Sequence, residues 1–185
     1  MDARRTAAAG EEPQLGDGTL AGERFREQLR ACLHVERWVD EVVDGAPYGS
    51  LDELLAAASA AATPLSRAEI DEALGAHPRI GERPAGDGPA AQFSRAEQSS
   101  ADADDAALAA AVAAGNRAYE SRFGRVFLIR AAGRSRAEIL AELSRRLELD
   151  EERELVAVGE QLREIARLRL EQTFADAHAP IGAAA

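Results

Sequence analysis

The chain contains a single cysteine, Cys32, among its 185 residues. An intrachain disulfide is therefore impossible, and a metal site built from several cysteines is excluded. The three histidines, His34, His77 and His178, lie far apart and lack the short spacing typical of metal-binding motifs. The sequence thus contains no recognisable metal centre, and none is expected.

Aromatic residues make up only 4% of the chain, and no apolar run is long enough to cross a membrane. Basic residues are outnumbered, with 22 Lys and Arg against 33 Asp and Glu, for a formal net charge of −11. Nucleic acid and anionic membrane surfaces would repel such a chain, so neither is expected as a partner. The first residues lack the apolar stretch of a signal peptide, and we expect a cytoplasmic protein.

Alanine is abundant, and it is the residue with the strongest intrinsic preference for helix. Helical periodicity extends over residues 19–45 with a break near 34, and over 50–62, 66–75, 94–122, 135–147 and 150–174. Several of these segments open with a Ser followed three residues later by Glu, the pattern of a capping box. The prediction is an all-α single-domain bundle of about seven or eight helices without significant sheet.

Three other segments complete the predicted organisation. Residues 1–18 lack periodicity and are expected to form a disordered lead-in, residues 19–176 the helical domain, and residues 177–185 a flexible tail. The only run of β-type residues is 126–129, which is too short to build a sheet by itself. It is predicted to be a buried extended connector or the start of a helix.

His77 stands where a helical pattern ends and a loop rich in Gly and Pro begins. Pro78 disfavours helical backbone at the residue before it, so the imidazole is expected to project from a break in the structure. A surface or capping role is the alternative to a catalytic one. Imidazole titrates near neutral pH, which makes His77 a candidate for proton transfer.

Glu97 and Arg169 are the two other candidates. Glu97 follows Ser94 by three residues, so it can be a capping residue, or it can contact a ligand bound at the start of a helix. Arg169 continues an apolar stripe made by Val158, Leu162 and Ile165, so its guanidinium is expected to face inward. Such a group needs an anion, which can be an internal carboxylate or a substrate carboxylate.

Four sequence blocks occur in an order that resembles a known family. They are H-P-R-I-G at 77–81, S-R-A-E-Q at 94–98, N-R-A-Y-E-S-R-F-G at 116–124 followed by V-F-L-I, and I-A-R-L-R-L at 165–170. Together they resemble the 2-oxo-4-hydroxy-4-carboxy-5-ureidoimidazoline (OHCU) decarboxylases, enzymes of urate degradation that give (S)-allantoin. The resemblance extends over roughly Phe25 to Phe174.

The resemblance implies an all-α homodimeric enzyme that needs no cofactor, with OHCU as its small-molecule substrate. It implies His77, Glu97 and Arg169 as catalytic residues. It further implies a substrate pocket lined by Pro78, Ser94, Arg95, Ala96, Glu97, Gln98, Phe127, Leu128, Ile129, Arg130 and Ala131. One departure is Ser100, where members of the family often have Gly, and it puts local packing in question.

Two other functions stay open at this point. The first is a non-catalytic helical interaction or dimerisation domain that retains the same scaffold. The second is an enzyme of this scaffold that acts on a different ureido-ring acid.

Overall fold

The computed structural model describes residues 20–77, 80, 92–93 and 105–175. Within these ranges the chain forms seven α-helices and no β-strand, which confirms the predicted all-α fold. The helices are α1 (Leu20–Cys32), α2 (Glu36–Asp44), α3 (Leu51–Ala61), α4 (Arg67–Gly75), α6 (Ala106–Phe123), α7 (Arg136–Leu147) and α8 (Glu151–Phe174). The expected lead-in at 1–18 and the expected tail at 177–185 lie outside the described residues.

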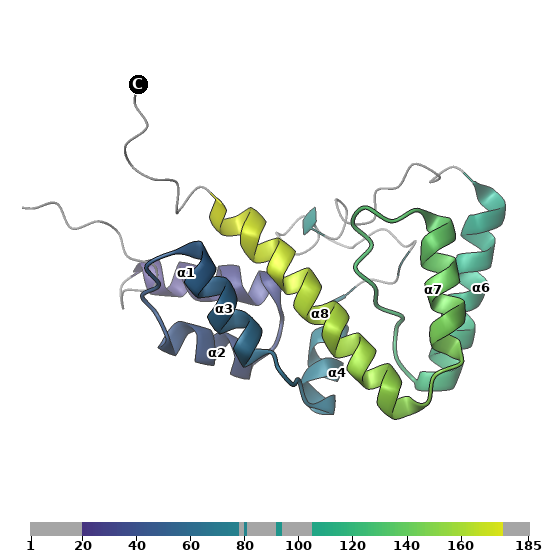
Figure 1. The fold of residues 1–185 in the computed structure, drawn as a ribbon, viewed down its shortest axis with the longest axis horizontal. Helices are drawn as coiled ribbons and strands as arrows, with labels where there is room; N and C mark the ends of the chain where they lie inside the picture. The colour runs from purple at the N-terminus through teal and green to yellow at the C-terminus, as the bar shows by residue number, and fades with distance from the viewer. Residues whose placement is uncertain (1–19, 78–79, 81–91, 94–104, 176–185) are drawn as a thin grey trace, which may run out of the picture.

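Helix α8 is the element against which the others are arranged. Its 24 residues span about 36 Å, and it runs diagonally across the molecule in Figure 1. Helices α1, α3 and α4 pack against it, while α6 and α7 form a pair at the other end of the molecule. Residues from widely separated parts of the chain can therefore meet along one helix.

The predicted capping boxes set several of the helix boundaries. The hydroxyls of Ser66 and Ser135 accept hydrogen bonds from the third residue of α4 and α7, and the Glu side chains at those positions accept from the serine N–H groups. Ser50 and Asp150 cap α3 and α8 through their side-chain oxygens. These starts agree with the sequence pattern to within one residue.

The prediction of one continuous helix over 94–122 is wrong, while its predicted start at Ser94 lies outside the described residues. The helix that contains Tyr119 begins at Ala106, not at Ser94, because Asp105 has extended backbone and its carboxylate accepts from the N–H groups of Ala107 and Leu108. Alanine favours helix equally along the whole stretch, so composition alone did not show where this helix starts.

The buried apolar residues form two clusters. The larger cluster contains residues of helices α1, α2, α3, α4 and α8. Among them are Leu29, Trp38, Leu54 and Leu162. The smaller joins α6 and α7 with the connector at 127–131. Residues 126–131 have no regular structure and are mostly buried, which confirms a buried connector and rules out a helix start.

Helices α6 and α7 approach one another closely at a glycine. A Cβ atom on Gly115 would lie 2.4 Å from the Cδ2 atom of Leu143, so any larger residue would force the two helices or that leucine side chain to move. The absence of a side chain at Gly115 therefore lets the Leu143 side chain pack directly on α6.

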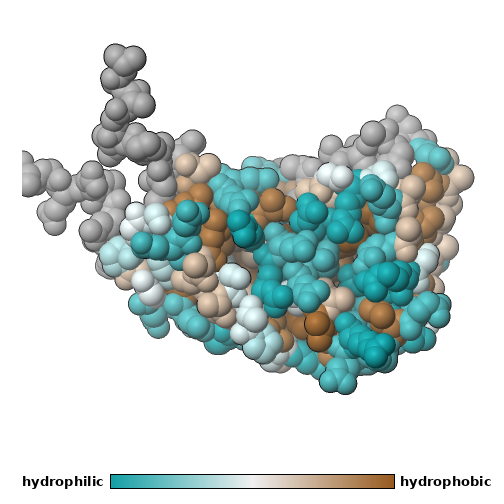
Figure 2. Space-filling view, in the orientation of Figure 1, coloured by the Kyte–Doolittle hydropathy of each residue, from teal (hydrophilic) through white to brown (hydrophobic). Residues whose placement is uncertain are grey.

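The surface mixes polar and apolar side chains without one dominant apolar area on the face shown in Figure 2. Val156, which is 60% exposed, is the only large hydrophobic residue with that degree of exposure among the described residues. No helix in the part of the chain that the structure describes is long and apolar enough to cross a membrane.

Candidate active site

His77 lies two residues beyond the end of α4, which confirms that it stands outside a helix. Its backbone N–H donates to the Leu74 carbonyl at 3.0 Å, and its Nδ1 atom lies 2.8 Å from the Ala73 carbonyl oxygen. A carbonyl oxygen can only accept, so Nδ1 carries the hydrogen in this contact. The half-buried imidazole is thereby oriented with Nε2 as the nitrogen that can take up a proton.

Arg169 faces inward from α8, as its place on the apolar stripe predicts, and only 3% of the residue is exposed. Its Cζ atom lies 5.5 Å from the centroid of the Phe93 ring, and its Nη1 atom donates a long hydrogen bond, 3.4 Å, to the Ala31 carbonyl. Phe93 directly precedes Ser94 in the sequence. The contact therefore brings the chain just before the 94–98 block to the guanidinium.

The connector at 127–131 is fixed by side chains from two helices. Arg146 of α7 donates through Nη1 to the Leu128 carbonyl at 2.7 Å, and the Arg130 N–H donates to Oε1 of Gln161 on α8 at 2.9 Å. Phe127, Leu128, Ile129 and Ala131 are buried, and Arg130 is half-buried. The Arg130 N–H already has a protein partner, so any backbone contact to a substrate here must use other groups.

The same Arg146 belongs to a buried polar network that sequence analysis missed. Its Nε atom lies 2.9 Å from both carboxylate oxygens of Glu154, and the Tyr119 hydroxyl donates to that carboxylate. All three residues are fully buried. Burial, reinforced by the hydrogen bond to Glu154, raises the pKa of Tyr119 well above its ordinary value.

A signal for this network was present in the sequence. Arg146 continues the stripe of Ile139 and Leu143 on α7, just as Arg169 continues the stripe on α8. Glu154 lies four residues before Val158 and so starts the same α8 stripe. Charged residues on two apolar stripes indicate a buried pair, although the stripes alone do not say which residues meet.

The remaining expected site residues lie outside the described residues. They are Pro78, Ser94, Arg95, Ala96, Glu97 and Gln98, together with Ser100. The described geometry thus concerns His77, Arg169 and the connector. Among the described residues, no group of three or more His, Cys, Asp or Glu side chains is arranged to hold a metal ion.

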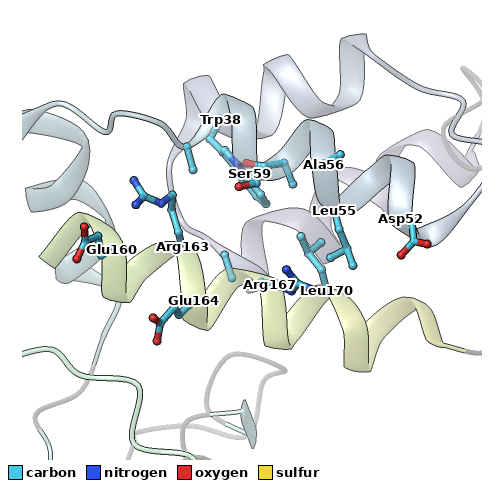
Figure 3. Close-up of a pocket in the computed structure, with 13 residues that line it drawn as sticks. Trp38, Asp52, Leu55, Ala56, Ser59, Glu160, Arg163, Glu164, Arg167 and Leu170 are labelled. Carbon is cyan, nitrogen blue, oxygen red and sulfur yellow. Dashed lines mark hydrogen bonds between the residues drawn. The ribbon is translucent and has the colours of Figure 1, made fainter. Parts of the chain in front are cut away.

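A groove between α3 and α8 has a volume of about 610 Å³, which is a size typical of small-molecule sites (Figure 3). Its walls carry Asp52 and Ser59 on α3 and Arg163 and Arg167 on α8. Arg169 is two residues beyond Arg167, so it points to roughly the opposite side of α8. Neither His77 nor the connector lines this groove, and it is separate from the candidate site.

The fold and these residues define an all-helical protein whose candidate site supplies an imidazole at a helix end and a buried guanidinium on a long helix. A family model described as OHCU decarboxylase matches residues 19–171. The chain therefore belongs to the OHCU decarboxylase family, and this membership makes it an enzyme of the carboxy-lyase class.

Two curated proteins are similar in sequence. The chain is 31% identical over 158 residues to the 2-oxo-4-hydroxy-4-carboxy-5-ureidoimidazoline decarboxylase of Haloferax volcanii, covering 84% of this chain and 92% of that protein. It is 30% identical over 161 residues to the uric acid degradation bifunctional protein TTL of Arabidopsis thaliana. That match covers 85% of this chain but 49% of the Arabidopsis protein, so the chain spans about half the length of this relative.

Two solved structures share the fold. One is an OHCU decarboxylase crystallised in the presence of (S)-allantoin, with a TM-score of 0.68, 25% identity, and coverage of 81% of this chain and 99% of that one. The other is an (S)-allantoin synthase, with a TM-score of 0.61, 21% identity, and coverage of 81% and 50%. At that identity the second likeness shows the fold alone.

Proposed function

We propose that this chain converts OHCU to (S)-allantoin in urate degradation, with His77, Glu97 and Arg169 as its catalytic residues. Family membership supports the reaction class. The structural observation that carries the assignment to residues is the inward guanidinium of Arg169, which is 3% exposed and lies against Phe93. A buried arginine suits a carboxylated substrate because its planar group binds carboxylate oxygens in pairs.

The proposed reaction needs no cofactor because the substrate contains its own electron sink. The bond to the carboxylate carbon breaks, carbon dioxide leaves, and the electron pair flows toward the neighbouring C=N group of the ring. The nitrogen that receives the electron pair takes up one proton from solvent, which gives an enol-like intermediate. Loss of its hydroxyl proton and protonation of one face of the neighbouring carbon then give a single enantiomer. The protein then has to bind, orient and move a proton, tasks that side chains perform by themselves.

His77 is the residue proposed to move that proton. Its Nδ1 atom is bound to the Ala73 carbonyl, so the exchange takes place at Nε2. The imidazole accepts the proton of the substrate hydroxyl and donates to one face of the intermediate. Proton transfer by a positioned imidazole contributes a rate factor of roughly 10²–10⁴.

Arg169 and Glu97 are proposed to bind the two ends of the substrate. The guanidinium takes the carboxylate or carbonyl oxygens, and the Glu97 carboxylate accepts from the ureido N–H groups. Pro78, the 94–98 segment and the 127–131 connector are proposed to line the pocket. In the connector we assign this contact to groups other than the Arg130 N–H, which donates to Gln161.

The assembly and location are part of the same proposal. We propose a homodimer in the cytoplasm, with residues 19–176 as the catalytic domain between a lead-in at 1–18 and a tail at 177–185. The family resemblance supports the dimer, and the net charge of −11 is compatible with a protein that binds neither nucleic acid nor anionic membranes. Light scattering coupled to gel filtration measures the mass and tests the dimer.

The experiment that tests the reaction is circular dichroism of the product made from freshly generated OHCU. The substrate decays by itself to racemic allantoin, so a chiral signal identifies catalysis where mere disappearance of substrate does not. Wild type should give the signal of (S)-allantoin, and His77→Ala should give almost none while its far-ultraviolet spectrum stays helical. A wild-type product without chirality would contradict the function, and a fully active His77→Ala would contradict the residue assignment.

A further inference from the structure

Asn116 on α6 forms a hydrogen bond that ties this helix to the segment containing His77. Its Nδ2 atom donates to the Ile80 carbonyl at 2.9 Å, across 36 positions of sequence. Ile80 follows His77 by three residues. Asn116 itself is 7% exposed and Ile80 is half-buried, so this bond is partly buried.

Only one of the two polar atoms of the Asn116 amide has a hydrogen-bond partner among the described residues. A carbonyl oxygen can only accept, so the amide nitrogen faces Ile80 and the Oδ1 atom faces elsewhere. Oδ1 is buried and has no hydrogen-bond partner among the described residues. A buried acceptor without a partner is destabilising, so the amide carries this cost together with the bond that it donates to the Ile80 carbonyl. The neighbouring cluster is apolar, with Ile80 packed against it.

The amide is carried on a helix that packs closely against α7. Gly115, its neighbour, allows α6 to approach Leu143 of α7 so closely that no larger residue fits without displacement. The other end of the His77 segment is held by α4, through the bonds to the Ala73 and Leu74 carbonyls. His77 is therefore bound to α4, and Ile80, three residues later in the sequence, is bound to α6.

We propose that Asn116 is a positioning residue that fixes the His77 imidazole for proton transfer by holding the Ile80 carbonyl. The catalytic consequence rests on the proposed function, whereas the effect on the imidazole itself does not. Asn116 does not touch the reacting atoms in this role. A displacement of the imidazole by about 1 Å is enough to lower turnover by about 100-fold.

The test uses Asn116→Leu, with Asn116→Ala as a second variant in case the larger side chain does not fit. Val112→Ala is the matched control, since Val112 is buried on the same face one turn earlier and its side chain has no group that can donate to the Ile80 carbonyl. For Asn116→Leu we expect kcat to fall by about 10- to 100-fold with KM within about threefold of wild type. The melting temperature should stay close to that of wild type, because the variant removes the unpartnered Oδ1 as well as the bond to the Ile80 carbonyl. Val112→Ala should lower the melting temperature and leave kcat unchanged.

A second readout is independent of turnover. The chain has three histidines, so the imidazole resonances can be followed by nuclear magnetic resonance and His77 assigned by its loss in His77→Asn. Asn116→Leu and Asn116→Ala should shift the His77 resonances and their titration midpoint, and Val112→Ala should not.

The outcomes separate this inference from the proposed function. An active wild type whose Asn116 variants keep both kcat and the His77 resonances would overturn the inference and leave the function intact. An inactive wild type would overturn the function, while the His77 resonances would still decide whether Asn116 fixes the imidazole.

Discussion

Arg146 and Glu154 form an ion pair in which neither side chain has any exposed surface. The pair joins α7 to the start of α8, and the same arginine holds the Leu128 carbonyl of the connector. Its Cζ atom also lies 5.0 Å from the centroid of the Phe127 ring. One buried guanidinium therefore fixes two helices and the segment proposed to line the pocket.

Removing one partner of this ion pair should strongly destabilise the folded protein. In Glu154→Gln the arginine keeps its charge in a buried environment without a counter-charge, and we expect the free energy of unfolding to fall by about 3–5 kcal/mol. Urea unfolding followed by circular dichroism measures it. The double variant Arg146→Met, Glu154→Leu should recover a large part of the loss, because it leaves no charge buried. A cost below about 1 kcal/mol for Glu154→Gln would show that water reaches the pair.

The ion pair between Arg37 of α2 and Glu69 of α4 predicts a dependence of stability on acid pH. The hydrogen bond from Arg37 is the main reason that the pKa of Glu69 is lowered to about 2. A lowered pKa in the folded state adds stability that is present above the unfolded value of about 4.3 and is lost as the pH falls toward 2.

Comparison of wild type with Glu69→Gln across this range checks it. The free energy of unfolding of wild type should exceed that of Glu69→Gln by about 0.5–1 kcal/mol at pH 7, a small value because the pair lies at the surface. The difference in unfolding free energy should vanish near pH 2. Glu53→Gln is the control, because Glu53 accepts from the Gly49 N–H near the start of α3 but forms no ion pair among the described residues. An equal pH dependence in both variants would contradict the role of Arg37.

Glu97→Gln separates a capping role from a substrate contact. Glutamine can still accept from a serine N–H, so loss of a cap alone should change activity and melting temperature little. A residue that binds the ureido group should instead lose at least about 100-fold in kcat/KM, and this is the expected result. Glu138→Gln is the matched control, since the S-R-A-E sequence at 135–138 forms a capping box on α7. If both variants show equally small changes in kcat/KM and melting temperature, Glu97 acts only as a helix cap.

Arg169→Lys tests whether the planar guanidinium is required. Lysine keeps the positive charge but loses the paired donors, so kcat/KM should fall by at least about 10-fold, mainly through KM. Arg167→Lys is the control, because Arg167 is exposed and pairs with Glu171 at 2.9 Å. If both variants keep wild-type kinetics, Arg169 does not bind the substrate.

The fold could be predicted because most of its determinants are local. Serine or aspartate caps and an apolar residue every three or four positions predicted the helices at 51–61, 67–75, 136–147 and 151–174 nearly to the residue. The start at Ala106 was missed because the alanines around it favour helix everywhere, and the cap at Asp105 was not recognised. Where the local signal is uniform, the position of a boundary depends on one side chain.

The candidate site was predicted only in part, because contacts between residues far apart in the chain produce little recognisable pattern in the sequence. The inward direction of Arg169 followed from the apolar stripe, and the break at His77 followed from the proline after it. Nothing in the pattern indicated that Asn116 would reach Ile80.

The sequence by itself determined the helical class, the places where most helices begin, and the inward direction of the charged residue on the last helix. These depend on backbone preferences and on periodicity within a few residues. Only the tertiary structure decided that Arg146 meets Glu154, that Phe93 lies against Arg169, and that Asn116 of α6 binds the Ile80 carbonyl. Such pairs depend on how whole helices pack, and packing is settled by the shapes of many side chains acting at once.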